Sequence, residues 1–99
     1  MSLVNNEKNE AAEAMEIEIK NKLGLHARPA AMFVRIANQF TSEITVEKDN
    51  EQVNGKSIMD LMMLAAGRGS LLRITADGED ADEALKAIAD LAERKFDEE

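Results

Sequence analysis

The spacing of the hydrophobic residues switches repeatedly between two patterns along the chain, and this switching constrains the fold more than any other feature. Apolar and polar residues alternate in "MEIEIKN" (15–21), "SEITVEK" (42–48) and "SLLRITA" (70–76), which is the pattern of a half-buried strand. Val53 lies in a further short strand after the turn "DNEQ" (49–52), so it pairs with the strand before it as a hairpin. The sequence therefore predicts four strands.

Three other segments place apolar residues three and four positions apart, as on one face of a helix. Pro29 lies in the first turn of the first helix, where no amide donor is required. Ser57 resembles the N-cap of the second helix with Asp60 at the position of a capping box, and Asp80 or a neighbour caps the third after a break at Gly78. The three apolar faces comprise Pro29, Met32, Phe33, Ile36, Ala37 and Phe40; Ile58, Leu61, Met62 and Ala65, up to a stop at Gly67 or Gly69; and Ala81, Ala84, Leu85, Ile88, Leu91 and Ala92.

The order of elements is β-α-β-β-α-β-α, and it points to one architecture. Three amphipathic helices can cover the apolar face of a four-stranded sheet, and the direct hairpin favours an antiparallel or mixed sheet over a parallel one. We predict an α+β fold, an open-faced β-sandwich in which a four-stranded antiparallel sheet carries three helices on one face. One domain spans residues 15–99, and the polar residues 1–14, which have no hydrophobic period, form a mobile N-terminal extension.

Composition excludes several classes of function. The chain has no cysteine and a single histidine, which excludes disulfides, Cys-type metal sites and a multi-His site within one chain, so no metal or cofactor is expected. A net charge of −8 argues against nucleic-acid binding. The longest apolar run, 61–66, is too short to cross a membrane, and no secretory signal is present. We expect a cytoplasmic protein without membrane insertion, and we take it to be a monomer.

Positive charge is nevertheless concentrated in one stretch of the chain. No acidic residue occurs in 20–42, where Arg28 and Arg35 lie near the only histidine, His26. The acids gather later, five of them within 77–83. Charge patterning supports two interpretations equally: a solvated acidic helix with a chance gap elsewhere, or a small basic surface around His26 that suits an acidic partner or a phosphate.

His26 lies at the start of the first predicted helix, within "GLHARPAA" (24–31). It is at or just before the N-cap, where the amides of Ala27 and Arg28 lack acceptors within the helix and can bind an anion. The Arg28 guanidinium adds a bidentate partner for an oxyanion, and a neutral imidazole is a nucleophile. These parts would let His26 accept a phosphoryl group. A capping or surface histidine without chemistry is the equally weighted alternative.

Other kinds of chemistry have less support. A Ser-His-Asp triad would have to be assembled from scattered residues, without a nucleophile-elbow motif. "NGKS" (54–57) resembles the end of a phosphate-binding loop, but Asn50 stands where that motif needs a glycine, so we reject nucleotide binding. Ser57 is at least a helix cap, although a phosphate there would lie at a helix N-terminus beside Lys56.

Two methionines of the second helix also have two interpretations. Met59 and Met63 are four residues apart, lie off the predicted core face and are expected to be partly exposed. Such a stripe is usually peripheral core, but exposed methionines at helical spacing also form adaptable docking surfaces. The residues alone leave both interpretations open.

Two motifs together carry a resemblance to a known family. "GLHARPAA", followed about thirty residues later by "VNGKSIMDLMMLAAGRGS" (53–70), resembles HPr, the histidine-containing phosphocarrier protein of the bacterial phosphoenolpyruvate-dependent phosphotransferase system. The resemblance covers about residues 15–96 and implies the same open-faced β-sandwich. It implies that His26 is phosphorylated on Nδ1 by phospho-enzyme I and passes the group to a IIA domain, with Arg28 assisting. Such a protein is a carrier within a relay rather than an enzyme.

The second motif has implied roles of its own. Ser57 matches the serine that a dedicated HPr kinase/phosphorylase modifies in many bacteria. Ile58, Met59 and Met62 match the apolar docking patch next to that serine, and we add Arg35 of the basic stretch to the docking residues.

Three hypotheses of function follow. The main one is a phosphocarrier that acts through His26 and serves the IIA domains of sugar permeases. The second is a regulatory module of the nitrogen-related or catabolite-control kind, in which Ser57 and the methionines engage a kinase/phosphorylase or a transcriptional regulator. "SIMDLMMLAA" resembles the nitrogen-related branch, whereas Pro29 fits the sugar-type motif "HARPA" better; Asp60 places an acid beside Ser57, which favours carriage over regulation there. The third is a structural domain without phosphate chemistry.

Overall fold

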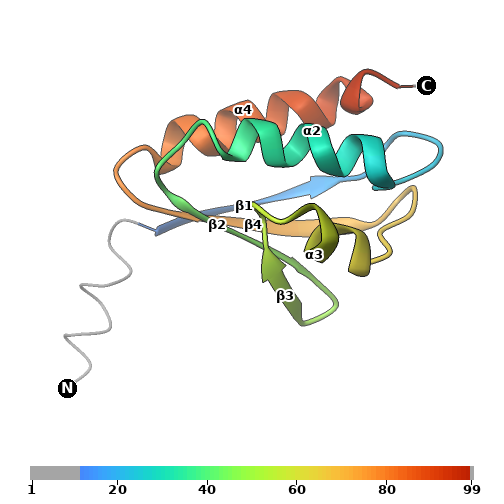
Figure 1. Ribbon diagram of the computed structural model, residues 1–99, viewed down its shortest axis with the longest axis horizontal. Coiled ribbons are helices and arrows are strands. Elements are labelled where there is room, and N and C mark those ends of the chain that lie inside the picture. The colour runs from blue at the N-terminus through green and yellow to red at the C-terminus, as the bar shows by residue number, and fades with distance from the viewer. Residues whose placement is uncertain (1–11, 99) are drawn as a thin grey trace.

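The computed structural model of the protein describes residues 12–98, and within them the predicted order of strands and helices is confirmed (Figure 1). The elements are β1 (Ala12–Glu18), α2 (Ala27–Ala37), β2 (Glu43–Lys48), β3 (Glu51–Asn54), α3 (Ile58–Met63), β4 (Leu71–Asp77), α4 (Ala81–Glu93) and a final turn, η1 (Lys95–Asp97). β1 begins before Met15, where the strand was expected to start. The rest of the predicted extension, residues 1–11, lies outside the described residues.

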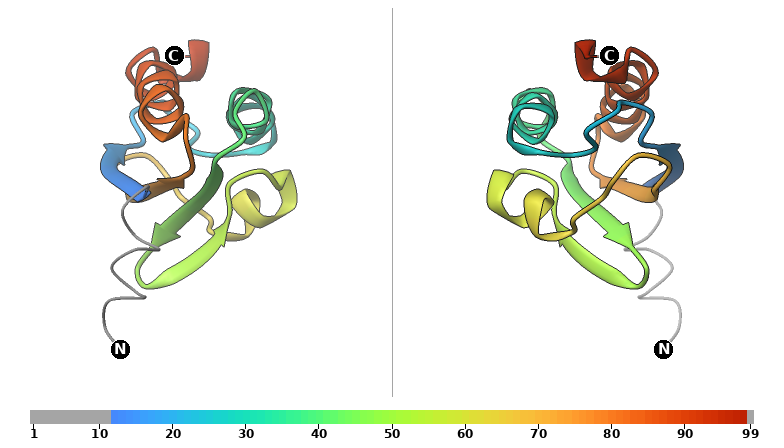
Figure 2. Two further views of the ribbon diagram at one scale, coloured as in Figure 1. Left: turned by 90° about the vertical axis from the view of Figure 1, so that its left-hand side faces the viewer. Right: turned by 90° about the vertical axis from the view of Figure 1, so that its right-hand side faces the viewer.

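The four strands form one antiparallel sheet with the order β1-β4-β2-β3. α2 and α4 lie side by side over one face of this sheet, and α3 lies next to α2 on the side of β3 (Figure 2). The opposite face has no covering layer within residues 12–98. The fold is therefore the predicted open-faced β-sandwich, and β1 and β3 are its edge strands.

The core lies between the sheet and the helices. Strand residues contribute every second side chain to it, as expected from the pleat of a strand, and the predicted apolar face of α4 is confirmed in full. The members that fill this layer include Ile17, Ile44, Val46, Leu72 and Ile74 from the sheet, Ala30, Phe33 and Ala37 from α2, and Ala81, Ala84, Leu85, Ile88, Leu91 and Ala92 from α4. Phe40 was expected to continue α2, but the helix ends at Ala37 and Phe40 packs against the core from the following loop.

The hairpin between β2 and β3 is tighter than the sequence predicts. The expected four-residue turn is a two-residue turn, in which Asp49 and Asn50 have φ of 52° and 70°. Positive φ at both central residues is typical of the type I′ turn, which matches the twist of the two strands, and Asp and Asn tolerate it better than other non-glycine residues. β3 therefore begins at Glu51, earlier than expected.

α3 is shorter than the sequence predicts. The helix was expected to reach Gly67 or Gly69, but it ends at Met63, and Ala65 has a φ of 52°. Beyond the helix, the Ala66 carbonyl accepts a 2.8 Å hydrogen bond from the amide of Leu25, in the loop before α2. The segment after the early end of α3 therefore packs against that loop.

Asp80 has a different role from the predicted helix cap. It is the N-cap residue of α4, but its side chain makes no capping hydrogen bond. Its carboxylate instead accepts hydrogen bonds from the Thr41 amide (2.8 Å), the Ser42 amide (3.0 Å) and the Ser42 hydroxyl (2.5 Å). Asp80 thus ties the start of α4 to the loop that follows α2.

This arrangement predicts a specific acid sensitivity. The hydrogen bond from the Ser42 hydroxyl, followed by that from the Thr41 amide, lowers the pKa of Asp80 to about 2. A lowered pKa in the folded state stabilises the protein above the ordinary carboxyl range near pH 4, and this stabilisation is lost as the pH falls toward 2. Urea unfolding of the wild type should therefore lose more stability between about pH 4 and pH 2 than that of Asp80→Asn. Glu79→Gln, which removes a neighbouring charge, should behave like the wild type, and an equal loss in wild type and Asp80→Asn would contradict the assignment.

Candidate functional site

Four segments, from three separate parts of the sequence, meet at one end of the molecule, on the right in Figure 1. They are the loop before α2, the first turn of α2, the segment after α3 and the chain after α4. Backbone hydrogen bonds join the first and third of them: the Leu25 amide donates to Ala66 (2.8 Å), and the Gly69 amide donates to Ile19 (2.7 Å). The single histidine lies at this junction.

His26 is the N-cap residue of α2, as predicted. Its backbone is extended (φ −81°, ψ −167°), its carbonyl accepts from the Ala30 amide (3.0 Å), and its side chain makes no capping hydrogen bond. Pro29 has no amide hydrogen. Within residues 12–98, the amides of Ala27 and Arg28 have no hydrogen-bond acceptor. The first turn of α2 therefore presents two free donors next to the His26 ring, which is the geometry that an anion requires.

The His26 ring contacts a carboxylate that the sequence did not indicate. Nε2 lies 3.0 Å from each carboxylate oxygen of Glu98, and the Asn21 amide group donates to Glu98 Oε1 (3.1 Å) and to the Gly24 carbonyl (2.7 Å). The hydrogen bond with His26 is the main reason why the pKa of Glu98 is lowered, and the hydrogen bond from Asn21 and the charge of Arg28 act in the same direction. Asn21 is fully buried, and the Glu98 side chain is 15% exposed against 38% for His26.

Of the two candidate arginines, Arg28 lies close to His26 and Arg35 lies farther along α2. Arg28 is in the same first turn and is exposed, so it can reach a group bound at the helix N-terminus. Arg35 is exposed in the last turn of α2, about two and a half turns or roughly 13 Å along the axis from His26. Arg35 therefore belongs to the same helix as the site but not to its phosphate-binding end.

A shallow depression of about 290 Å³ connects His26 with the end of α3. Its lining side chains are mostly apolar, so the His26 side chain borders an apolar surface. The depression is lined by Leu23, Leu25, His26, Met62, Ala65, Ala66 and Gly67.

The predicted core face of α3 is wrong in three of its four members. Leu61 is the only residue of α3 that is buried, whereas Ile58 and Met62 are 42% and 43% exposed and Ala65 is exposed beyond the end of the helix. Because the helix ends at Met63, Leu64 and Ala66 supply the core contacts that a longer helix would have taken from its own face. Met59 and Met63 are 73% and 69% exposed, in line with the prediction. We call Ile58, Met59, Met62 and Met63 the α3 apolar surface.

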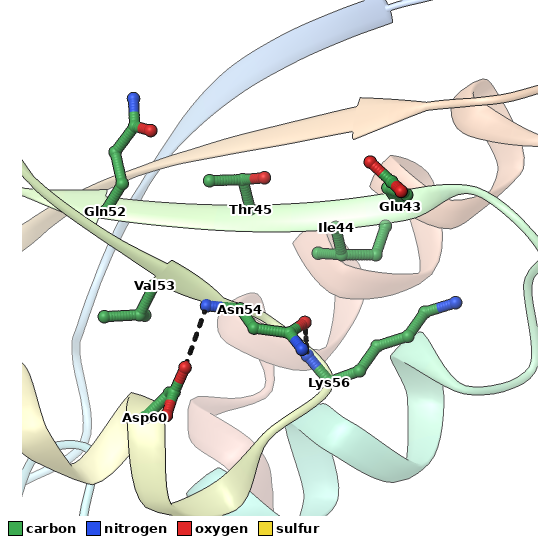
Figure 3. A pocket seen from close by; sticks show the side chains of 8 residues that line it. All are labelled: Glu43, Ile44, Thr45, Gln52, Val53, Asn54, Lys56 and Asp60. Atoms are coloured by element: carbon green, nitrogen blue, oxygen red, sulfur yellow. Dashed lines mark hydrogen bonds between the residues drawn. The ribbon is translucent and has the colours of Figure 1, made fainter.

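Ser57 is the N-cap of α3, as predicted, but the capping box is incomplete. Its hydroxyl accepts from the Asp60 amide (3.1 Å), while the Asp60 carboxylate accepts from the Asn54 amide (3.3 Å) rather than from that of Ser57. Figure 3 shows Asp60 turned toward Asn54, and the Lys56 side chain leading away from both. The Lys56 ammonium donates to the Phe40 carbonyl (2.8 Å) and not to the Ser57 hydroxyl. The residues drawn there line a second depression of about 550 Å³ beside β2 and β3.

The described part of the chain shows no metal-binding cluster and no membrane-spanning helix. Among residues 12–98, no three side chains of His, Cys, Asp or Glu are grouped in a way that could hold a metal ion. No helix in this range combines the length and the apolar character needed to cross a bilayer.

The chain belongs to the HPr family of the phosphotransferase system. The family described as "PTS HPr component phosphorylation site" matches residues 13–94. The chain is 52% identical over 82 residues to a phosphocarrier protein HPr of Neisseria meningitidis, which covers 83% of this chain and 92% of that protein. It is 51% identical over 80 residues to an HPr-like protein Crh of Halalkalibacterium halodurans, which covers 81% of this chain and 95% of the other.

The fold agrees with solved structures of the same family. The crystal structure of HPr-C-His from Thermoanaerobacter tengcongensis superposes with a TM-score of 0.85 at 55% identity and covers 88% of this chain and 98% of that chain. HPr from Bacillus anthracis superposes with a TM-score of 0.80 at 48% identity and covers 84% of this chain and 99% of that chain. The family that the two sequence motifs predicted is therefore confirmed.

Proposed function

We propose that the protein is a cytoplasmic phosphocarrier in which His26 accepts a phosphoryl group from phospho-enzyme I and passes it to a IIA domain. The observation that carries this proposal is the position of His26 at the N-terminus of α2, next to the free amides of Ala27 and Arg28. A ring nitrogen there can attack while the helix amides hold the oxygens of the group that arrives.

The transfer requires one bond to form and one to break. The lone pair of His26 Nδ1 attacks phosphorus, and the bond between phosphorus and the donor atom of enzyme I breaks, with its electron pair returning to that atom. Two amides and the Arg28 guanidinium stabilise the negative oxygens during this exchange. Passage to a IIA domain is the same displacement in the opposite sense. The proposal involves no metal and no cofactor.

Partner docking is assigned to the surface beside the site. The α3 apolar surface joins the depression that contains His26, because Met62 belongs to both. Its exposed Ile58, Met59 and Met62 form the apolar contact for enzyme I and IIA domains, and Arg35 on α2 provides a cation for an acidic patch of the partner. We also propose the monomer as the acting form.

Labelling by a cognate enzyme I tests the proposal. The purified chain is incubated with enzyme I and radiolabelled phosphoenolpyruvate, and a family member with known carrier activity serves as the positive control. We expect one phosphoryl group per chain, labile in acid and stable in base. Absence of label in a mixture where the positive control is labelled would contradict the proposal.

A regulatory role through Ser57 is the second candidate. It is supported by the position of Ser57 at the start of the α3 apolar surface and by the likeness to a protein named HPr-like protein Crh. A kinase/phosphorylase or a transcriptional regulator would then be the partner at this surface. A phosphate on Ser57 would add negative charge three residues before Asp60, and the Lys56 ammonium is already bonded to the Phe40 carbonyl, so this role has weaker electrostatic support than carriage by His26.

Replacing Ser57 by alanine separates the two roles. We expect Ser57→Ala to lose any acid-stable label introduced by a cognate HPr kinase and ATP, yet to keep the acid-labile label from enzyme I. The variant also loses the hydrogen bond from the Asp60 amide to the Ser57 hydroxyl, which caps α3. Its free energy of unfolding in urea should therefore fall by about 0.5–2 kcal/mol. Ser70→Ala is the control, and kinase labelling that persists in Ser57→Ala would exclude Ser57 as the modified residue.

A further inference from the structure

We propose that Glu98 and Asn21 are positioning residues that hold the His26 proton on Nε2 and so leave Nδ1 as the attacking nitrogen. The proposal deepens the phosphocarrier function and rests on it. It concerns the resting protein, before any partner binds, so its direct readout needs no partner.

The contact between His26 and Glu98 determines which nitrogen is free. Both carboxylate oxygens of Glu98 lie 3.0 Å from Nε2. An ionised carboxylate can only accept hydrogen bonds, so the ring nitrogen that it faces must donate. A neutral imidazole has a single N–H, and with that proton on Nε2 the lone pair is on Nδ1.

Asn21 holds the carboxylate in this position. Its amide group donates to Glu98 Oε1 (3.1 Å) and to the Gly24 carbonyl (2.7 Å), two residues before His26. The Asn21 side chain is fully buried, so its amide group has little freedom to turn. One buried amide thus connects the loop that carries His26 with the segment that carries Glu98.

The backbone after α4 is shaped so that Glu98 returns to the site. Lys95, Phe96 and Asp97 have φ of 56°, 53° and 57°, a conformation that is unfavourable for residues with a Cβ atom. The turn is held by the Phe96 side chain, which is completely buried, and by a hydrogen bond from the Glu98 amide to the Lys95 carbonyl (2.9 Å). Burial of Phe96 stabilises this strained turn, and the turn places the Glu98 carboxylate against His26.

The carboxylate also has a role once the phosphoryl group has arrived. When Nδ1 of the neutral ring bonds to phosphorus, the proton stays on Nε2 and the ring becomes positively charged. Glu98, on the Nε2 side, offsets this charge at hydrogen-bond distance. No proton has to leave the ring during transfer in either direction, so the carrier can accept and donate without a separate base.

The tautomer of His26 is the direct readout. The chain contains one histidine, so ¹⁵N labelling of histidine gives one pair of ring signals. In alkaline buffer, where imidazoles are neutral, we expect the wild type to show protonated Nε2 and unprotonated Nδ1. Glu98→Gln should shift both signals toward a mixture of tautomers, because its amide group can either accept from Nε2 or donate to it.

Glu93→Gln is the matched control variant. It removes one negative charge from the end of α4, where Glu93 pairs with Lys20 at 2.9 Å and does not touch His26. Its ring signals should equal those of the wild type, whereas the rate of phosphorylation by enzyme I should fall about 10-fold in Glu98→Gln only. Ring signals of Glu98→Gln that match the wild type, or an unchanged rate despite altered signals, would overturn the proposal.

The phosphocarrier function and the positioning role of Glu98 can be refuted separately. If the wild type is never phosphorylated while Glu98→Gln alters the ring signals as expected, the phosphocarrier function is wrong and the assignment of the proton to Nε2 stands. If the wild type is phosphorylated and Glu98→Gln changes neither the signals nor the rate, the carrier function stands and the positioning role of Glu98 is wrong.

Discussion

Replacing His26 by alanine is expected to abolish the acid-labile phosphoryl label completely while leaving the protein folded. The imidazole is the only side chain at the start of α2 with a nitrogen lone pair that can attack phosphorus. The His26 backbone carbonyl accepts from the Ala30 amide, which the substitution leaves in place, and the side chain caps nothing and bonds to a single carboxylate, that of Glu98. The free energy of unfolding in urea should therefore change by no more than about 1 kcal/mol.

A second substitution removes the nucleophile but keeps a hydrogen-bond donor for Glu98. In His26→Gln the side-chain amide can still donate to the Glu98 carboxylate but offers no nucleophile for phosphorus. We expect this variant to be folded and unlabelled as well. Label that persists in either variant would show that another residue carries the phosphoryl group, and the proposed site would then be wrong.

Replacing Gly24 by alanine is expected to destabilise the protein by about 2–5 kcal/mol, the sum of a backbone cost and an overpacking cost. Gly24 has a φ of +75°, which a residue with a Cβ atom seldom adopts. An added Cβ would lie 2.6 Å from the Ala66 carbonyl oxygen and 2.8 Å from Gly67 Cα. Both are backbone atoms, and the same Ala66 carbonyl accepts from the Leu25 amide, so the junction cannot widen without losing that bond.

Gly67 provides the matched control for this substitution. A Cβ added at Gly67 would have no atom within 4 Å. The free energy of unfolding of Gly67→Ala should therefore lie within about 1 kcal/mol of the wild-type value. Urea unfolding of both variants measures the difference. Because Gly24 lies two residues before His26, any folded Gly24→Ala protein should also be phosphorylated more slowly. Equal stability of the two variants would mean that the close contact at Gly24 is not maintained in solution.

The order of elements could be predicted because the hydrophobic period reports directly which side of a strand or helix faces the core. In β2, in β4 and on the whole apolar face of α4, the buried residues are those that the spacing selects. In α3 they are not, because the helix ends before the glycine that was expected to stop it. There the chain leaves the helix at Met63, and Ala65 takes a positive φ that no pattern of apolar residues announces.

The candidate site likewise has one part that the sequence predicts and one part that it does not. His26 and its free amides depend on neighbours in sequence, so a proline and a change of period were enough to locate them. Glu98 lies 72 residues from His26 and is one of many acids toward the end of the chain. Asn21 is a polar residue in a loop, where burial is not expected. Contacts of this kind come from the packing of separate segments, and neither periodicity nor spacing signals them.

The bonding of the phosphoryl group tests the central claim most directly. The chain is prepared with ¹⁵N-labelled histidine, phosphorylated with enzyme I and phosphoenolpyruvate, and studied by NMR for the coupling between ³¹P and the ring nitrogens. Because there is one histidine, the assignment is unambiguous. We expect that phosphorus is bonded to Nδ1 of His26 and that Nε2 still carries its proton. Phosphorus bonded to Nε2, or to any residue other than His26, would contradict it.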